Sequence, residues 1–318
     1  MKKWLTTIVV IAVTALLLGY ALWQVDLAAL GDVLAGADYR FVAPFLMTLS
    51  LFFWIKAWRW AVILAPLGQY SVAQVTPAMM IGFAANNVLP AHLGEIVRSV
   101  WFARRYQQRI SAVLVSQILE RILDVLAILV LYLLAVPWID NPPEAIRISV
   151  WLVSAGAALL ATVIYTMLAS PQRVFNLWRV SSARLPEAIQ SRGKAFLEDV
   201  LQALSSVRSP RRLLLLLSNS VVQWSLMGVC LWISMAAMGV TIGPAVTIIA
   251  LTATVVAVTL PNAPGYIGAL QAAFVFALVP FGVSSESAFA GSVFYLVGNW
   301  IPITAIGGLF MVCAPARA

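Results

Sequence analysis

The sequence predicts an all-α polytopic membrane protein with six full transmembrane helices and two oppositely inserted re-entrant hairpins, arranged as an inverted repeat. Of its 318 residues, 62% are hydrophobic and only 10% are charged, whereas a soluble domain carries roughly 25% charged residues. Several apolar runs exceed the ~20 residues that a helix needs to cross a bilayer. We therefore expect one transmembrane domain over residues 1–318.

Charge and cysteine content exclude several classes of function. The formal net charge is +8, but the basic residues cluster in short segments beside apolar runs, as topology signals do, so nucleic acid is not an expected partner. Cys230 and Cys313 both lie in apolar runs, and the chain has a single histidine. Neither a disulfide framework, nor a metal site, nor a cofactor is therefore expected.

The first two spans are predicted at residues 4–23 and 41–66. The lysines at 2 and 3 resemble the start of a signal peptide, but the apolar region is too long and no A-x-A site follows, so we interpret it as a retained helix. Between the spans, an apolar stripe at Leu27, Leu30, Val33 and Leu34 predicts a short helix in the membrane interface. Lys56 and Arg59 lie near the inner end of the second span, where long basic side chains are expected to snorkel to headgroups.

Residues 71–102 are predicted to form the first re-entrant hairpin. Both flanks have cytoplasmic character, since "RRYQQR" at 104–109 follows directly. A segment that begins and ends on one side must be two crossings or a hairpin. The polar pair Asn86 and Asn87 and the later Glu95 and Arg98 favour a hairpin that turns at "NNVLPAHLG", because non-helical backbone is tolerated at membrane depth where it is packed in protein or lines an aqueous cavity.

The third and fourth spans are predicted at residues 110–137 and 148–169. They are followed by a long basic segment, 170–212, which the positive-inside rule places in the cytoplasm. Within it, the apolar positions are spaced as on one face of a surface helix: Ile189, Phe196, Leu197, Val200, Leu201 and Leu204. We interpret this face as structural, with docking of a cytoplasmic partner as the alternative.

The remaining chain repeats the earlier pattern. A span at 213–238 precedes an interrupted stretch at 244–281, and the last span covers 288–312. The count of basic loops places both termini in the cytoplasm if 244–281 is a second hairpin that enters from outside. The interruptions "NNVLPAHLGEIVR" and "VTLPNAPGYIGALQ" are similar, and they predict two repeats, about 1–138 and 145–318, of inverted topology. Chance similarity is the alternative.

Charged residues inside the predicted membrane region point to a functional site. Ser116, Glu120 and Asp124 lie at i, i+4 and i+8 on one helical face, and Arg121 is placed to pair with Asp124 at i+3. Near the bilayer centre each charge costs ~2.5–3.5 kcal/mol on insertion scales. Glu95 and Arg98 are likewise spaced to pair. The alternative to a functional site is a set of mutually satisfied polar groups that only fixes helix packing.

These groups suit an anionic headgroup. A helix that begins near Ala91 is expected to present free backbone N–H groups and its positive dipole end, beside Arg98 and Arg121, to a phosphate. The carboxylates Glu95, Glu120 and Asp124 are candidates to carry protons for coupling, while His92 is expected to be a polar lining residue.

The same residues carry a resemblance to a known family. "LPAHLGEIVR", "LERILD" and "LPNAPGYIG" resemble the three signature stretches of the flippase-like integral membrane family, which includes the transmembrane half of lysylphosphatidylglycerol synthases. The likeness covers essentially the whole chain in motif order, and it implies movement of lipids or lipid-linked intermediates between leaflets. Two positions depart from the pattern: His92 stands where an arginine is frequent, and Gln271 where an acidic residue is usual.

Charge positions and matched motifs together give the candidate substrate-binding and translocation residues: Asn86, Asn87, Pro90, His92, Gly94, Glu95, Arg98, Glu120, Arg121, Asp124, Pro261, Asn262, Pro264, Gly265, Gly268 and Gln271. No catalytic residue and no metal ligand is expected among them.

The sequence therefore predicts a lipid transporter of the bacterial inner membrane whose substrate is an anionic or polyprenyl-phosphate-type lipid. Lysyl transfer is not expected, because nothing hydrophilic follows the last span. An integral membrane enzyme of lipid biosynthesis and a non-catalytic scaffold are the alternative functions. A second copy of the chain or a protein of envelope biosynthesis are further candidate partners.

Overall fold

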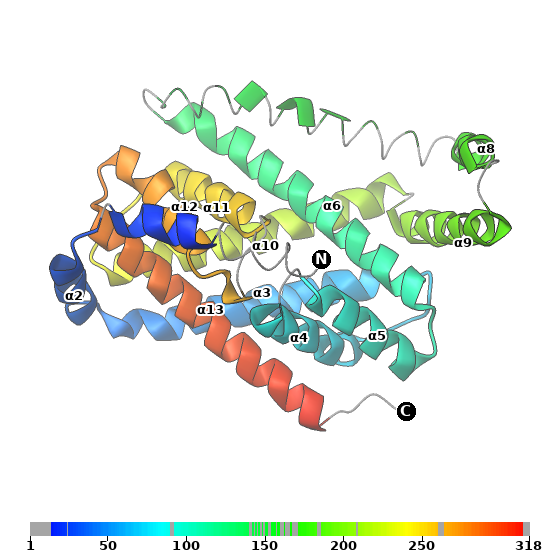
Figure 1. The fold of residues 1–318 in the computed structure, drawn as a ribbon, viewed down its shortest axis with the longest axis horizontal. Coiled ribbons are helices and arrows are strands. Elements are labelled where there is room, and N and C mark those ends of the chain that lie inside the picture. The colour runs from blue at the N-terminus through cyan, green and yellow to red at the C-terminus, as the bar shows by residue number, and fades with distance from the viewer. Residues whose placement is uncertain are drawn as a thin grey trace.

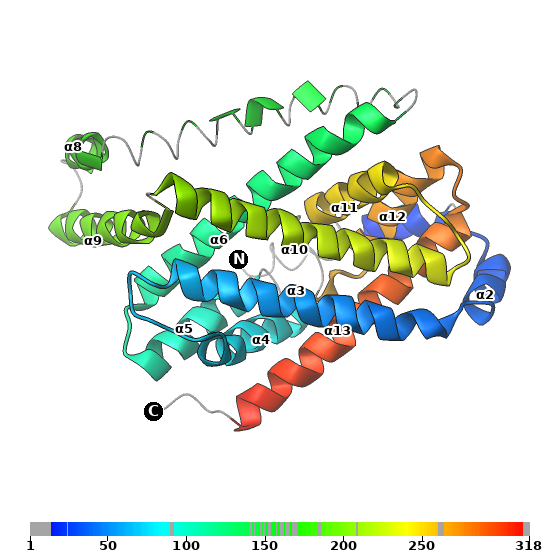
Figure 2. The same cartoon turned by 180° about the vertical axis from the view of Figure 1, so that it is seen from behind.

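The computed structural model describes residues 14–23, 25–89, 92–139, isolated positions between 142 and 166, 171–182, 186–207, 209–259 and 264–313. Every regular element within these residues is a helix, as the sequence predicts. Figure 1 and the reverse view in Figure 2 show long helices that run side by side between two ends of the molecule.

Three of the described helices are long and apolar enough to cross a membrane. They are α3 (Val42–Ile63, preceded by the 3-10 turn η1, Tyr39–Phe41), α10 (Pro210–Ala237) and α13 (Ser285–Cys313). They match the predicted spans at 41–66, 213–238 and 288–312. The helix Thr14–Trp23 meets α2 (Leu27–Ala35) at 85°, and the two make a fourth candidate if they form one span.

The predicted span at 110–137 is the 26-residue helix α6 (Ile110–Ala135), which η2 (Val136–Trp138) extends. At a rise of 1.5 Å per residue it is about 39 Å long, enough to cross a bilayer. Glu120, Arg121 and Asp124 lie near its middle. The predicted span at 148–169 lies mostly outside the described residues, and residues 4–13 of the first predicted span lie wholly outside them.

The first predicted hairpin is a tight pair of antiparallel helices, α4 (Val72–Val88) and α5 (Gly94–Tyr106). Ser71 and Gln74 form a capping box at the start of α4. The helices approach so closely that a Cβ on Gly94 would lie 2.0 Å from the carbonyl oxygen of Gly82, so glycine is required there. Asn86 closes the turn, since its Oδ1 accepts a hydrogen bond from the Gly94 N–H at 2.7 Å.

The second interruption also folds back on itself. It comprises α11 (Pro244–Thr259), η4 (Pro264–Tyr266) and α12 (Ala269–Leu278), with η5 (Val279–Phe281) beyond, and α11 packs against α12. Gly265 (φ 77°) and Gly268 (φ 87°) hold left-handed backbone conformations that glycine adopts without steric cost. Gln271 then starts α12 by accepting a hydrogen bond from the Gly268 N–H at 2.7 Å through Oε1. A helical hairpin therefore occurs at each predicted interruption.

The basic segment forms α8 (Pro171–Ser182), α9 (Glu187–Leu204) and η3 (Ser205–Val207) at the end of the molecule opposite α2 (Figure 1). The predicted apolar face of α9 divides in two. Val200, Leu201 and Leu204 join a hydrophobic cluster with residues of α3, α6 and α10, whereas Ile189 and Phe196 are exposed. Arg109 pairs with the buried Asp199 at 3.1 Å and fastens α9 to the start of α6.

Candidate functional site

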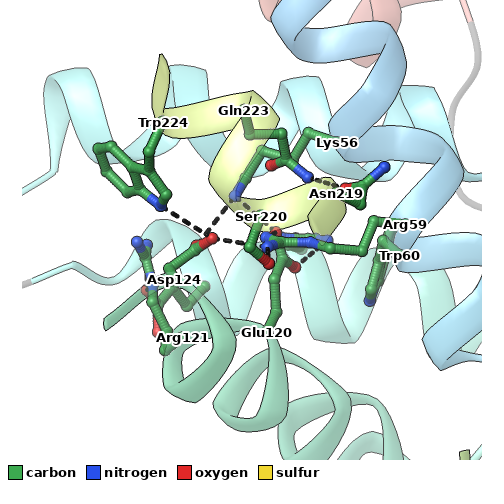
Figure 3. Close-up of polar contacts among 12 residues, drawn as sticks. Lys56, Arg59, Trp60, Glu120, Arg121, Asp124, Asn219, Ser220, Gln223 and Trp224 are labelled. Atoms are coloured by element: carbon green, nitrogen blue, oxygen red, sulfur yellow. Dashed lines mark hydrogen bonds and ion pairs between the residues drawn. The ribbon is translucent and has the colours of Figure 1, made fainter. Parts of the chain in front are cut away.

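Two cations of α3 meet two carboxylates of α6 inside the helical bundle (Figure 3). Lys56 Nζ lies 2.8 Å from Glu120 Oε1 and 3.1 Å from Asp124 Oδ2. Arg59 Nη2 lies 3.3 Å from the same Glu120 oxygen, and Arg59 Nη1 lies 2.7 Å from Asp124 Oδ1. All four side chains are buried. The spacings of three and four residues place each pair on one helix face, so the two rows of charge face each other.

A third cation, Arg98 of α5, completes the group. Its Nη2 lies 2.9 Å from Glu120 Oε2, and its guanidinium carbon lies 3.6 Å from the centre of the Trp60 ring, a cation–π contact. Trp60 in turn donates a hydrogen bond to Ser116 Oγ at 3.1 Å. We call Lys56, Arg59, Arg98, Glu120 and Asp124 the buried charge cluster.

Helix α10 closes the cluster with neutral groups only (Figure 3). Trp224 donates its indole N–H to Asp124 Oδ1 at 3.1 Å, and Arg59 Nη1 donates to Ser220 Oγ. These neutral groups add hydrogen bonds to Asp124 and Arg59 without changing the charge, while the Nε atoms of Arg59 and Arg98 have no hydrogen-bond partner in the described part of the chain. The cluster therefore contains three cations and two carboxylates.

A second ion pair lies beside the cluster and is more exposed. Arg121 Nη2 and Nε lie 2.6 Å and 3.0 Å from Glu95 Oε1. The two side chains are 46% and 33% exposed, in contrast to the buried cluster. This pair joins α6 to the first turn of α5 and is open to an approaching ligand.

The exposed pair lines a cavity of about 350 Å³ that both hairpins share. Trp300 of α13 ties the hairpins together, because it donates a hydrogen bond to the Asn87 carbonyl at 3.3 Å while its ring borders Gly265. The His92 and Tyr266 rings, one from each hairpin, lie 5.9 Å apart. The polar lining consists of Asn86, Asn87, His92, Glu95, Arg121, Asp124, Thr254, Thr259 and Asn299.

The rest of the lining is mostly apolar and aromatic. It includes Phe52, Phe53, Phe83, Val125, Ile128, Met227, Leu251, Val255, Val258, Leu270 and Leu296. A few polar groups in a largely apolar wall are typical of sites that bind small molecules, and the volume falls within the usual range of ~300–1,000 Å³.

The predicted ion pairs within single helices are wrong. Arg121 pairs with Glu95 rather than Asp124, and Arg98 pairs with Glu120 rather than Glu95. Since α5 lies against α6, side chains on the facing surfaces meet across the helix interface. The expectation of free N–H groups at the start of α5 is also wrong. Asn86 accepts from Gly94, and the carbonyl of His92 accepts from the Glu95 N–H at 3.1 Å.

The other predicted site residues lie in the turns of the hairpins, at the cavity wall or outside the described residues. Gly94, Gly268 and Gln271 shape and cap the two turns, and Gly265 lines the cavity. Gln271, which stands where an acidic residue is usual in the resembling family, is a buried capping residue. Pro264 begins η4. Pro90, Pro261 and Asn262 lie outside the described residues.

Lys56 and Arg59 are the site residues that sequence reasoning missed. We expected them to snorkel to headgroups, but both are buried and paired. The two cations lie three residues apart in an otherwise apolar helix, and Glu120 and Asp124 lie four residues apart in another. This similar spacing could have predicted that the two pairs face each other. Glu120 and Asp124 are both paired with cations. No group of three potential metal ligands occurs within the described residues.

Comparison with known proteins places this architecture in a family. No curated protein matches the chain. The family model described as lysylphosphatidylglycerol synthase TM region matches residues 7–307, which include both hairpins and the buried charge cluster. The chain therefore belongs to the lysylphosphatidylglycerol synthase transmembrane-region family of membrane proteins.

Proposed function

We propose that this protein moves a lipid with a phosphate-bearing headgroup, an anionic phospholipid or a polyprenyl-phosphate-type lipid, between the leaflets of the bacterial inner membrane. The observation that carries the proposal is the cavity shared by the two hairpins, with the exposed Arg121–Glu95 pair in a largely apolar wall. Both termini face the cytoplasm in this proposal, and the hairpins enter the membrane from opposite sides.

The headgroup binds by competition with Glu95 for Arg121. A guanidinium forms strong, paired hydrogen bonds with phosphate as it does with carboxylate. Arg121 is the most exposed cation among the ion pairs that border the cavity, so a phosphate reaches it without opening the buried charge cluster. The amides of Asn86, Asn87 and Asn299 supply neutral contacts to the rest of the headgroup. The apolar wall accepts the first part of the lipid tails.

Movement of the lipid between leaflets requires the two hairpins to move relative to each other. Broken helices from two halves of a chain that meet around one site are the arrangement in which transporters open the site alternately to each side. Here the halves meet through hydrogen bonds from Asn87 to the Trp300 carbonyl at 3.3 Å and to Thr304 Oγ1 at 2.9 Å. They also meet through close packing of α4 on α13, where a Cβ on Gly307 would lie 2.4 Å from the Met80 carbonyl oxygen. In this proposal these contacts rearrange when the site opens to the other side.

The test is a leaflet assay in liposomes with fluorescent phosphatidylglycerol and the Arg121→Gln variant. Glutamine keeps part of the polarity but removes the charge, and a hydrogen bond to a charged group is worth about 1.5–3 kcal/mol, so transport should fall by at least about tenfold. Thermal unfolding should change little, because Arg121 is half exposed.

Arg179→Gln is the matched control, since Arg179 is exposed on α8. Undiminished transport by Arg121→Gln, or equal losses in both variants, would refute the proposed role of the cavity. A lipid that is covalently changed by the wild-type protein would indicate an enzyme instead, and wild-type protein that moves no lipid would favour a scaffold.

A further inference from the structure

The positive and negative charges of the ion pairs around the cavity are not equal in number. Within the described residues they comprise four cations, Lys56, Arg59, Arg98 and Arg121, and three carboxylates, Glu95, Glu120 and Asp124. The elements that pack on α3 add no compensating charge. Helix α4 has no charged residue, and the other charges lie in the first turns of their elements: Arg40, Arg211, Arg212 and Glu286. One positive charge is therefore in excess in the membrane interior.

Only one of the cations is able to release its proton. A guanidinium remains protonated in proteins, so Arg59, Arg98 and Arg121 keep their charge. Protonation of a carboxylate would increase the excess rather than remove it. Glu120 already has three cationic partners, and Asp124 has two together with the indole N–H of Trp224. Lys56 is the remaining group, because a buried ammonium is the cation that desolvation readily deprotonates.

Lys56 also lies directly behind the cavity wall. Its Nζ is 5.7 Å and 5.8 Å from the centres of the Phe52 and Phe83 rings, and 3.1 Å from Asp124 Oδ2. Phe52, Phe83 and Asp124 all line the cavity. An anion in the cavity is therefore separated from Lys56 by one layer of side chains in a medium of low polarity, where charges interact strongly.

We propose that Lys56 is the proton-carrying group of this site, neutral before a phosphate group enters the cavity and protonated when the phosphate is bound. The amine takes one proton from solution and becomes an ammonium, so the protein gains one positive charge for one negative charge of the phosphate. No other bond forms or breaks. This inference rests on the proposed function for its ligand class. It assigns the proton to Lys56 instead of the carboxylates that the sequence suggested.

Proton uptake makes binding depend on pH in a defined direction. Because the bound state holds one more proton than the free state, affinity falls as pH rises, by about tenfold per pH unit once free Lys56 is neutral. By the same linkage, a bound phosphate favours protonation of Lys56.

The experiment measures binding of dioleoylphosphatidylglycerol to the purified full chain in detergent by calorimetry, at several pH values and in two buffers of different protonation enthalpy. Inorganic phosphate is the second ligand. The variants are Lys56→Arg, whose charge is permanent, and Lys56→Met, which is permanently neutral. Lys194→Arg is the control, since Lys194 is exposed on α9.

We expect wild-type and Lys194→Arg proteins to take up one proton per bound lipid. Lys56→Arg should bind without uptake and with the same affinity across the pH range, and Lys56→Met should bind at least tenfold more weakly without uptake. Uptake with both ligands would show recognition of phosphate itself, and uptake with the lipid alone would show that the tails are required. Thermal unfolding of each variant shows whether it is folded.

Binding without proton uptake at every pH, or uptake that persists in Lys56→Arg, would overturn the inference, as would the absence of binding. Transport is measured separately. Proton-linked binding without leaflet transfer would refute the proposed function and leave this inference intact. Leaflet transfer without proton uptake would refute this inference and leave the proposed function intact.

Discussion

Glu120 holds three helices together through one carboxylate. Its Oε1 contacts Lys56 and Arg59 of α3, and its Oε2 contacts Arg98 of α5. Asp124 shares the α3 cations but does not contact Arg98. Removal of the Glu120 charge therefore leaves Arg98 without a carboxylate partner and makes the net charge of the cluster more positive by one.

Glu120→Gln should accordingly lower the free energy of unfolding by about 3–5 kcal/mol, the usual cost when one partner of a buried ion pair is removed. The measurement is thermal unfolding of purified protein in detergent. Glu198→Gln, at an exposed position of α9, is the control and should have no measurable effect. Equal stability of the two variants would mean that Glu120 is not ionised in the folded protein.

The sequence predicts which residues are charged in the interior but not which of them pair. Periodicity places Glu120 and Asp124 on one face of a helix, because that relation is local. Their partners Lys56 and Arg59 lie more than sixty positions away in the chain, and only the packing of α3 on α6 brings them together. Sequence spacing predicts partners within the same helix for Arg121 and Arg98, because it contains only local information. In the structure both arginines pair across the α5–α6 interface instead.

At the scale of the elements, the α4–α5 hairpin depends on close approach of its two helices. Gly82 and Gly94 face each other across the pair, and a Cβ on Gly82 would lie 2.6 Å from the Arg98 Cβ. Small residues at such contacts allow helix backbones to pack tightly in membranes. The same contact positions Arg98 for Glu120 and Asn86 for the turn.

Gly94→Ala should destabilise the protein and weaken lipid movement together. The added Cβ would lie 2.0 Å from the Gly82 carbonyl oxygen and 2.5 Å from Asn86 Oδ1, so the hairpin must open. Overpacking of this kind typically costs about 1–3 kcal/mol. Gly31→Ala on α2 is the control because no atom lies within 4 Å of its added Cβ. A Gly94→Ala protein as stable as the control would contradict the packing described for this hairpin.

Helix α9 shows how far a periodic pattern predicts an element. The spacing of its apolar residues predicts the helix and its face correctly. It does not show that the carboxyl-terminal half of that face is covered, since the covering residues come from α3, α6 and α10. Leu204 is 6% exposed and Ile189 is 47% exposed, although both belong to the predicted face.

Leu204→Ala should therefore lower the free energy of unfolding by about 2–4 kcal/mol through loss of buried apolar contacts. Ile189→Ala should change it by less than about 0.5 kcal/mol, as expected of an exposed position. Chemical or thermal unfolding of both variants makes the comparison. A larger loss of stability in Ile189→Ala than in Leu204→Ala would contradict the packing described for α9.

At the scale of the whole molecule, the long helices run between an end that contains α2 and an end that contains α8 and α9 (Figures 1 and 2). Asp26 and Asp32 of α2 and its cap lie at one end, and the described basic residues Arg179 of α8 and Lys194 of α9 lie at the other. This distribution agrees with the positive-inside rule if α9 is cytoplasmic and α2 is external. The orientation itself is a prediction.

Single cysteines at Asp32 and Glu198 should label from opposite sides of the membrane. The background should carry Cys313→Ser, since Cys313 is exposed, while Cys230 is buried. An impermeant maleimide added to intact spheroplasts should label Asp32→Cys alone, and permeabilised cells should label both. Labelling of both positions in intact spheroplasts would refute the proposed topology, including the opposite entry of the two hairpins.

The contacts of α3 with α6 also constrain how the chain is made. Synthesis delivers the amino-terminal part first, so α3, with Lys56 and Arg59, leaves the ribosome before Glu120 and Asp124 are available. A charge at the centre of a membrane helix opposes insertion by about 2.5–3.5 kcal/mol. Lys56 and Arg59 lie in the last third of α3, where the cost is smaller, but they still lack their carboxylate partners until α6 is made. Helix α3 is therefore expected to reach its final position only after α6 arrives and the four side chains pair. The two helices are expected to settle in the bilayer together, and formation of the buried charge cluster then fixes their arrangement in the new chain.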